Sequence, residues 1–194
     1  MVRRGGGVTD IEVRALSRPD GLTMAVLHVR MNAIDAMGAN IMNQSCEFLK
    51  QPIEDLTGEK VTMCILSNLV DTKLTKATVR MRLEPELASK IEEASLFAKQ
   101  DPYRAATNNK GVLNGMDPIL IATGNDWRAV EAGVHAYAAR DGQYRSITAW
   151  KRDGAYLVGT LIAPIVVGTV GGVTALHPTA KMCLEMLGTD SASE

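Results

Sequence analysis

IEVRALSRPDGLTMAVLHVRMNAIDAMGANIMNQSCEFLKQPIEDL, residues 11–56, decides the fold of the first third of the chain. Apolar positions recur through Ile11, Val13 and Leu16 and again through residues 22–31, a pattern that predicts two neighbouring strands. Residues 18–21 between them read RPDG, a turn signal because proline presets φ and Asp-Gly accepts a tight bend. We therefore expect a β-hairpin near the N-terminus.

The second half of this stretch changes from strand to helix periodicity. Apolar residues from Met37 to Leu49 recur at helical spacing, which predicts a helix over 35–56 with Asp35 as its N-cap. The following segment, KVTMCILSNL over 60–69, has high β-propensity and predicts a third strand. The order strand, strand, helix, strand favours an α+β layer with helices on one face of a mostly antiparallel sheet.

A second pattern begins near residue 70 and runs to the C-terminal end. Residues 85–100 predict an amphipathic helix whose apolar face carries Leu87, Ile91, Ala94 and Phe97. The mixture of helices and strands predicts a helix-rich α/β domain. Its other predicted elements are strands over 77–83, 144–151 and 156–163, helices over 102–122 and 126–140, and a last helix after Pro178.

Charge and cysteine usage restrict the class of partner. The 21 Lys+Arg nearly cancel the 22 Asp+Glu, and neither sign forms a long run, which argues against nucleic acid and membrane surfaces as partners. Cys46, Cys64 and Cys183 are odd in number and lack metal-type spacing, which argues against a disulfide framework and a zinc site. We expect a cytoplasmic protein without a metal, with a small molecule or a protein as partner.

One apolar run is long enough to span a bilayer. Residues 156–176 read YLVGTLIAPIVVGTVGGVTAL and are almost free of polar side chains. The run contains four glycines and Pro164, is rich in β-branched residues, and lacks flanking aromatic or cationic anchors. A buried strand and turn is therefore favoured over a transmembrane helix.

The motif DAMGAN, residues 35–40, is a candidate phosphate site. In the predicted helix it places small residues in the first turn, where free N–H groups and the positive end of the helix dipole can meet a phosphate. The alternative is that Gly38 and Ala39 only allow close packing of helix on sheet. The residues alone favour neither interpretation.

Lys110 and Asp126 are the candidate reactive groups. A lysine held near a carbonyl can stabilise the negative charge that develops on its oxygen when hydride adds, although most lysines are simply solvated. Asp126 is either the N-cap of a helix or a buried carboxylate that pairs with Lys110 and tunes it. Both alternatives are open for both residues.

Six motifs taken together resemble the second, mostly prokaryotic class of 3-hydroxy-3-methylglutaryl-CoA (HMG-CoA) reductases. The resemblance is collinear and covers essentially the whole chain; DAMGAN and the spacing from NKG to GND are its specific parts. The motifs are RGGGVTDIEV (4–13), DAMGAN (35–40), ILSNL (65–69), DPYRAATNNKGVLNG (101–115), ATGNDWRAVEAGVHAYAARDGQY (122–144) and GTVGG (168–172).

The resemblance implies reduction of HMG-CoA to mevalonate and CoA by two equivalents of NADH or NADPH, in a homodimer or larger homo-oligomer. It implies a small ferredoxin-like NAD(P)-binding domain over 1–68 and part of a larger HMG-CoA-binding domain over 69–194. Lys110 is then the catalytic lysine and Asp126 the carboxylate that hydrogen-bonds it. Residues 35–40 (Asp35, Ala36, Met37, Gly38, Ala39 and Asn40) then contact the cofactor pyrophosphate, while Arg104, Asn114 and Asn68 face the substrate.

The resemblance also identifies groups that these 194 residues do not contain. The family's catalytic glutamate, its catalytic histidine and the acidic residue that selects between the two cofactors match no position here; His177 is not that histidine. We therefore expect little or no turnover from this chain alone. The alternatives are a non-catalytic nucleotide- or CoA-binding domain derived from the same scaffold, and a structural domain whose apolar surface a partner covers.

Overall fold

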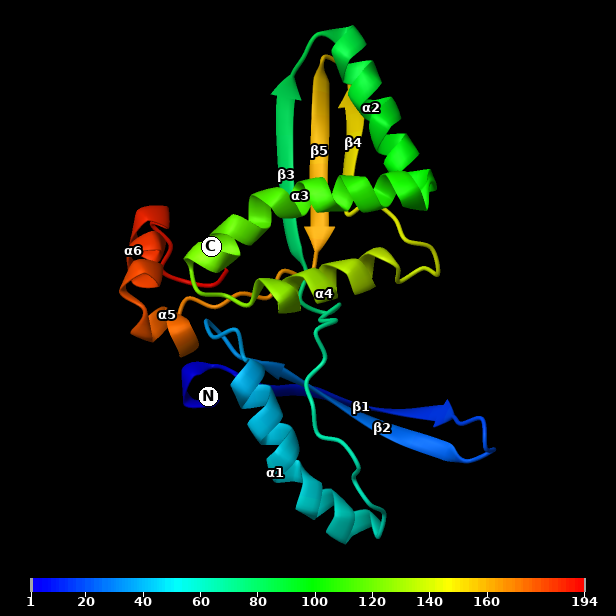
Figure 1. Cartoon of the computed structure of the whole chain (residues 1–194), viewed down its shortest axis with the longest axis vertical. Coiled ribbons are helices and arrows are strands. Elements are labelled where there is room, and N and C mark those ends of the chain that lie inside the picture. Colours follow the sequence, from blue (N-terminus) through cyan, green and yellow to red (C-terminus); the bar gives the residue numbers. More distant parts are fainter. Residues whose placement is uncertain (1, 194) are drawn as a thin grey trace. The chain divides into compact units, whose positions relative to one another are not determined.

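The computed structural model describes residues 2–193 and divides the chain into two compact units (Figure 1). Unit 1 contains the chain up to Leu66, Gly168–Gly171, and the chain from Thr189 onward; unit 2 contains Ser67–Val167 and Gly172–Gly188. The elements are η1 Val2–Arg4, β1 Gly7–Ser17, β2 Thr23–Asn32, α1 Ala39–Thr57, β3 Thr75–Arg82, α2 Pro85–Gln100, α3 Pro102–Ala122, α4 Trp127–Ala138, β4 Thr148–Asp153, β5 Tyr156–Ala163, α5 Gly172–Leu176 and α6 Pro178–Leu187. The predicted mixed fold class is confirmed.

Unit 1 begins with the β-hairpin that the sequence predicts. β1 pairs antiparallel with β2, and the register shifts once, between Val8 and Asp10. The RPDG turn closes the hairpin: the amide of Arg18 donates to the carbonyl of Leu22 at 2.9 Å, and the amide of Gly21 donates to the carbonyl of Arg18 at 3.1 Å. The order of unit 1, strand, strand and helix, occurs within the β-α-β-β-α-β order of ferredoxin-like folds.

α1 begins later than predicted, and Asp35 is not its N-cap. Gly38 occupies the N-cap position with a left-handed φ of 94°, and no side chain caps the helix. The carbonyl of Asp35 instead accepts from the amide of Thr169 at 2.8 Å, and its carboxylate accepts from the amide of Ala192 at 3.1 Å. The N-cap prediction was wrong because partners distant in sequence hold Asp35 outside the helix.

The strand predicted over residues 60–69 is not formed. Among the described residues this segment pairs with no strand, and its amides bond to side chains of α1. The amide of Val61 donates to the carboxylate of Glu54, and the amide of Leu66 donates to the side-chain carbonyl of Asn43, both at 2.9 Å. The prediction was wrong because β-propensity describes a preference for a pleated surface and does not supply a neighbouring strand.

Unit 2 contains a three-stranded antiparallel sheet in the order β3-β5-β4. The bounds of β3 and β5 follow the predicted strands closely. β4 begins at Thr148 instead of residue 144, because the side chain of Asn109 captures the backbone of Arg145 and Ile147 just before it. The sequence pattern therefore located the strand but placed its start too early.

Two helices of unit 2, α2 and α3, begin where proline and an acidic N-cap coincide. Glu84 accepts from the amides of Glu86 and Leu87 at the start of α2, and Asp101 caps the start of α3 in the same way. Proline at the first helical position lacks an N–H that would be unsatisfied there, so both helices start as predicted.

α2 packs through a different face from the predicted one. Ser95 accepts from the amide of Trp150 at 2.9 Å, and Glu92 accepts from the amide of Arg152 at 3.0 Å, so α2 satisfies the free edge of β4. Leu87 and Phe97 remain 48% and 53% exposed. The apolar face was a wrong prediction because the unpaired amides of β4 bind the polar side of α2.

The apolar run over 156–176 folds as predicted, into a strand and a turn. β5 uses its first part, and the short helix α5, which was not predicted, begins at Gly172. Across residues 2–193, no helix has both the length and the apolar character needed to cross a membrane.

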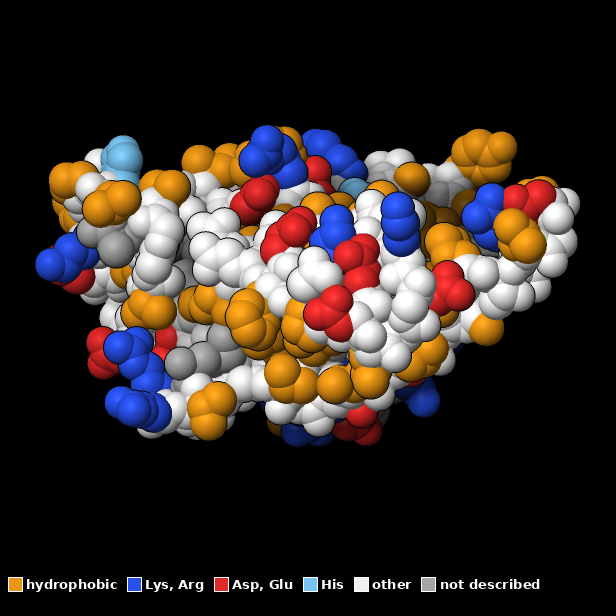
Figure 2. Space-filling model, turned by 90° about the horizontal axis from the view of Figure 1, so that it is seen from below, with side chains coloured by type: hydrophobic (Ala, Val, Ile, Leu, Met, Phe, Trp, Pro, Cys, Tyr) orange, Lys and Arg blue, Asp and Glu red, His pale blue; other side chains and the backbone are white. Residues whose placement is uncertain are grey.

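The apolar core of the described residues lies in unit 2. Leu157, Val130 and Val134 are its largest fully buried apolar side chains besides Pro164. In unit 1, by contrast, Phe48 is 78% and Leu56 86% exposed. Apolar side chains are correspondingly common on the face drawn in Figure 2.

Candidate functional site

α3 carries three of the predicted site residues. Lys110 and Asn114 are four residues apart and therefore lie on one face of the helix, where both are exposed. Arg104 is half-buried in the first turn, and its amide is one of those that Asp101 caps, at 3.4 Å. The helix thus brings Lys110 and Asn114 together and places Arg104 nearer its start.

Asn109 fixes α3, and sequence reasoning assigned it no role. Its side chain is fully buried; the amide donates to the hydroxyl of Tyr144 at 3.0 Å and to the carbonyl of Arg145 at 2.9 Å. Its carbonyl accepts from the amide of Ile147 at 3.0 Å. The hydroxyl of Tyr144 is in turn 2.7 Å from Nδ1 of His135. Because the next residue is Lys110, this network positions the candidate catalytic lysine.

The far half of α3 contains an acidic residue that also lacked a predicted role. Asp117 lies about two turns after Lys110 on the same face, and its buried Oδ1 has no hydrogen-bond partner among the described residues. Pro118 follows it and has no N–H to donate to the carbonyl of Asn114, four residues earlier. Polar acceptors therefore accumulate on the face that carries Lys110.

Asp126 is the N-cap of α4. Its carboxylate accepts from the amides of Arg128 and Ala129 at 3.1 and 3.3 Å, and it pairs with the guanidinium of Arg128 at 3.2 Å. Partial burial favours a higher pKa for Asp126, but the bonds from Arg128 and the amide of Ala129 outweigh it and leave the pKa below its ordinary value. No ion pair within residues 2–193 joins Asp126 to Lys110, so that pairing stays a prediction.

The turn between α3 and α4 is rigidly built. Thr123 is buried, and its hydroxyl donates to the carbonyl of Ile119 at 2.8 Å, while its own carbonyl accepts from the hydroxyl of Thr174 at 3.1 Å. Gly124 follows with φ 71°, and a Cβ there would lie 3.3 Å from Val173. The turn that presents Asp126 is therefore held against α5.

Asn68 lies where the chain enters unit 2. Its backbone carbonyl packs against Gly133 of α4 so closely that a Cβ at Gly133 would lie 2.5 Å from the oxygen. The side chain of Asn68 is exposed. The backbone of Asn68 is thus fixed on α4 while its amide group remains accessible.

DAMGAN meets a second glycine motif, GTVGG, from the other end of the chain. The amides of Thr169 and Val170 donate to the carbonyl of Asp35, and Ala36 forms a parallel bridge with Val170. At Gly168 a Cβ would lie 2.3 Å from the amide nitrogen of Met37. The sequence marked the two motifs separately, but nothing local indicated their contact.

This contact leaves an arrangement that suits a phosphate. The start of α1 has no side-chain cap and no acidic residue in its first turn, so its amides are available to an anion. Gly38 lets the start of α1 pack closely on Ala33, because a Cβ at Gly38 would lie 2.9 Å from the side chain of Ala33. The buried hydroxyl of Thr169 has no partner among the described residues. A dinucleotide pyrophosphate fits these groups.

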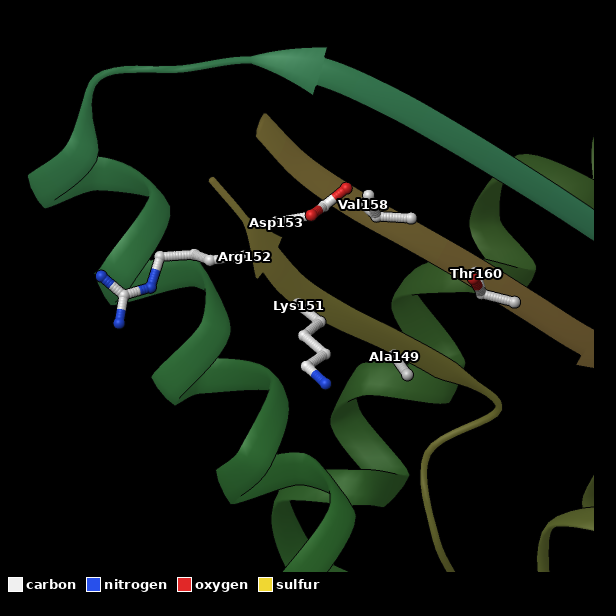
Figure 3. Close-up of a pocket in the computed structure, with 6 residues that line it drawn as sticks. All are labelled: Ala149, Lys151, Arg152, Asp153, Val158 and Thr160. Carbon is white, nitrogen blue, oxygen red and sulfur yellow. The ribbon is translucent and has the colours of Figure 1, made fainter. Parts of the chain in front are cut away.

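A hollow in unit 2 is lined by other residues. It has a volume of about 490 Å³ beside β4 and β5 (Figure 3). Its lining residues are Ala149, Lys151, Arg152, Asp153, Val158 and Thr160. None of them is a predicted site residue, so the hollow does not define the candidate active site.

Comparisons with known proteins agree on one family. The model of the family described as hydroxymethylglutaryl-coenzyme A reductase matches residues 1–194. A 3-hydroxy-3-methylglutaryl-coenzyme A reductase from Archaeoglobus fulgidus is 42% identical over the whole chain, which covers 45% of that protein. A probable enzyme of the same name from Borreliella burgdorferi is 32% identical, with 46% of its length covered. The chain spans about half the length of these relatives.

A solved structure supports the same relationship. The class II enzyme from Streptococcus pneumoniae, bound to NADPH in open conformations, is 43% identical and superposes with a TM-score of 0.93. The superposition covers 100% of this chain and 55% of the Streptococcus chain.

Proposed function

Since this chain belongs to the hydroxymethylglutaryl-coenzyme A reductase family, we propose that it supplies the central part of an enzyme that reduces HMG-CoA to mevalonate and CoA. The observation that carries the proposal is α3, which presents Lys110 and Asn114 together on an accessible face and is anchored through the buried Asn109. The reaction would make the protein an oxidoreductase of mevalonate and isoprenoid metabolism.

In this proposal Lys110 acts on the oxygen of the substrate carbonyl. Hydride addition to a thioester, and then to an aldehyde, leaves negative charge on that oxygen, and an ammonium group aimed at it lowers the barrier. Such a group is worth about 100-fold in rate or more. Asn109 would act as a positioning residue, because its hydrogen bonds hold the helix turn that carries Lys110.

The remaining residues on unit 2 would hold the substrate. We assign the free carboxylate of HMG-CoA to Arg104, because a guanidinium binds a carboxylate through paired hydrogen bonds. Asn114 and Asn68 present exposed side-chain amides that can bind carbonyl or hydroxyl oxygens. Asp126, ionised through Arg128 and the α4 amides, would set the charge near Lys110 when substrate is bound.

Nicotinamide cofactor would bind to DAMGAN in unit 1. The uncapped start of α1 supports binding of the pyrophosphate by backbone amides, and Gly38 and Gly168 allow the chain around these amides to pack closely. When bound, NADH or NADPH supplies the hydride. The choice between them is open in this proposal, although the Streptococcus relative is bound to NADPH.

We further infer that the protein acts in the cytoplasm as a homodimer or larger homo-oligomer. Its three cysteines are free thiols, as expected in a reducing compartment. The exposed Leu87 and Phe97 on α2 suit an interface with a second copy. Light scattering on the eluting peak of a sizing column tests this, and a strictly monomeric chain at micromolar concentration would contradict it.

The experiment that tests the function follows oxidation of NADH and NADPH by the purified chain with HMG-CoA. We expect Lys110→Ala to lower any turnover about 100-fold or more. Lys90→Ala is the matched control, because Lys90 is an exposed helical lysine paired with Glu86 on α2. Where the unaltered chain oxidises the cofactor, equal turnover in the two variants would refute the role of Lys110.

Binding measurements test the same proposal without turnover. Calorimetric titration of NADPH and HMG-CoA into the unaltered chain should give heats for both ligands, and Arg104→Ala should weaken HMG-CoA alone. Cofactor binding without HMG-CoA binding would instead support a nucleotide-binding domain derived from the same scaffold. Failure of both ligands to bind would support a purely structural role.

A further inference from the structure

Two of the three cysteines lie on facing parts of unit 1. Cys46 is on α1, and Cys64 belongs to residues 60–66, here called the flanking segment, which follows α1 in sequence. Hydrogen bonds tie the flanking segment to the helix at two points, Val61 to Glu54 and Leu66 to Asn43. Because the later residue bonds to the earlier helix position, the flanking segment runs antiparallel to α1.

The two bonds determine which residues face each other. From Asn43 to Glu54 the helix axis rises about 16 Å, and five residues of extended chain from Val61 to Leu66 also reach about 16 Å. The flanking segment therefore runs along the helix with little slack, and it twists between Val61 and Leu66 so that both amides face α1. Measured from the Asn43 anchor, Cys46 lies about 4.5 Å along the axis and Cys64 about 6.6 Å. The two cysteines are level to within about 2 Å.

The side chains also point in suitable directions. Alternate residues of an extended chain face opposite sides, and Cys64 and Leu66 are half-buried while Met63 and Ile65 are 75% and 62% exposed. Cys64 therefore lies on the shielded side of the flanking segment, the side that it shares with Leu66, and its charge acts on the Cys46 thiol. Cys46 is three residues after Asn43, on the neighbouring ridge of the same helix face, and is also half-buried.

The separation of the two backbones is set by a short side chain. Asn43 reaches the amide of Leu66 directly, at 2.9 Å, so the flanking backbone lies within about 6.5 Å of the helix Cα at that point. Disulfides join Cα atoms about 4.4 to 6.8 Å apart. Burial, followed by the neighbouring charge of Cys64, raises the pKa of the Cys46 thiol, which agrees with two thiols that are close together.

We propose that Cys46 and Cys64 form a redox-responsive site at which a low-molecular-weight disulfide, such as oxidised glutathione, introduces a Cys46–Cys64 disulfide. One protein thiolate attacks the small disulfide, forms a mixed disulfide and releases one small thiol. The second protein thiolate then attacks the protein sulfur of the mixed disulfide and releases the other small thiol. The two protein thiols lose two electrons and two protons, and the small disulfide gains them.

The disulfide would fasten the flanking segment to α1 directly before Ser67, where unit 2 begins. The site does not depend on the reductase proposal, because none of its residues is assigned to cofactor or substrate. Its chemistry is consistent with a cytoplasmic protein, since the thiols stay reduced until the small-disulfide concentration rises.

The test uses the full chain with Cys183→Ser, so that only the two thiols of interest remain. The protein is equilibrated with reduced and oxidised glutathione, quenched in acid, and its thiol state is read by mass spectrometry of the intact chain and of its peptides. With reduced glutathione at about 1 mM and an effective thiol concentration of about 10 mM or more, the internal disulfide should exceed glutathione adducts at least about 10-fold.

Two controls test whether the folded structure holds the two thiols together or whether their closeness in sequence alone explains the disulfide. In the same buffers with denaturing urea, the ratio of internal disulfide to adduct should fall at least about 10-fold. Met63→Cys combined with Cys64→Ser moves the thiol by one residue onto the exposed side of the flanking segment, and should give adducts in place of the internal disulfide. An unchanged ratio in urea, or an internal disulfide formed equally well from position 63, would overturn the proposal.

Discussion

Replacing Asn109 should destabilise unit 2 far more than replacing its neighbour Asn108 on α3. In Asn109→Ala the buried amide of Ile147 loses its acceptor, and the carbonyl of Arg145 loses a donor. An unpaired buried backbone group costs about 1–3 kcal/mol, so we expect a loss of about 3 kcal/mol in the free energy of unfolding. With a urea m-value of about 1–3 kcal/mol/M, the midpoint should fall by about 1–3 M.

Tryptophan emission is the appropriate probe, because both tryptophans, Trp127 and Trp150, belong to unit 2. The matched control is Asn108→Ala: Asn108 is half-buried and its amide donates to the hydroxyl of Thr148, so its loss should be about 1 kcal/mol. The reasoning is refuted if Asn109→Ala lies within about 0.5 kcal/mol of Asn108→Ala.

Three further predictions use the same chain. Gly133→Ala should destabilise unit 2 by about 1 kcal/mol or more, because its Cβ would meet the carbonyl of Asn68. Gly111→Ala should stabilise unit 2 by about 0.5–1 kcal/mol, because Gly111 lies within α3 and has open space around it. The urea midpoint should therefore fall in the first variant and rise in the second. Asp126→Asn keeps a capping oxygen but removes the charge. The pKa of Asp126 in the folded protein lies below the ordinary 3.8, so the stabilisation by its carboxylate is complete above pH 3.8 and is lost as pH falls through the folded pKa. The free energy of unfolding of Asp126→Asn should therefore be lower than that of the unaltered chain at neutral pH and equal to it at low pH. Gly168→Ala should weaken NADPH binding about 10-fold without moving the tryptophan-detected midpoint, because its Cβ collides with the backbone of DAMGAN; calorimetry would contradict this if the affinity were unchanged.

The parts of the fold that local chemistry determines could be predicted from the sequence. α2 and α3 have the predicted bounds because each combines an acidic N-cap with proline at the first helical position. The hairpin follows from RPDG in the same way. Signals of this kind act within a few residues, so their outcome does not depend on the rest of the chain.

The errors arose where distant groups decide the conformation. Asp35 was predicted as an N-cap from its position, but Thr169 and Ala192 bind it elsewhere. Residues 60–69 have the composition of a strand, but Asn43 and Glu54 take up amides that a strand would give to its neighbour. No local pattern contains these partners.

The residues of the candidate site differ in the same way in how far the sequence could identify them. The motif residues could be identified because their glycine, lysine and acidic residues occur in short motifs with a known chemical use. Asn109 could not, because one asparagine among Asn108, Asn109 and Asn114 looks like the others until the backbone that it binds is known. The assignments of Lys110 and Asp126 stay predictions that the experiments above address.

The bridge between Ala36 and Val170 has a consequence for the order of events during synthesis. A ribosome adds about 5–20 residues per second, so the DAMGAN loop leaves it on the order of ten seconds before the residues that hold it exist. Unit 2 up to Val167 is made during that interval. The anchoring of the loop must then wait for this late contact, whatever the intrinsic speed of the hairpin and α1.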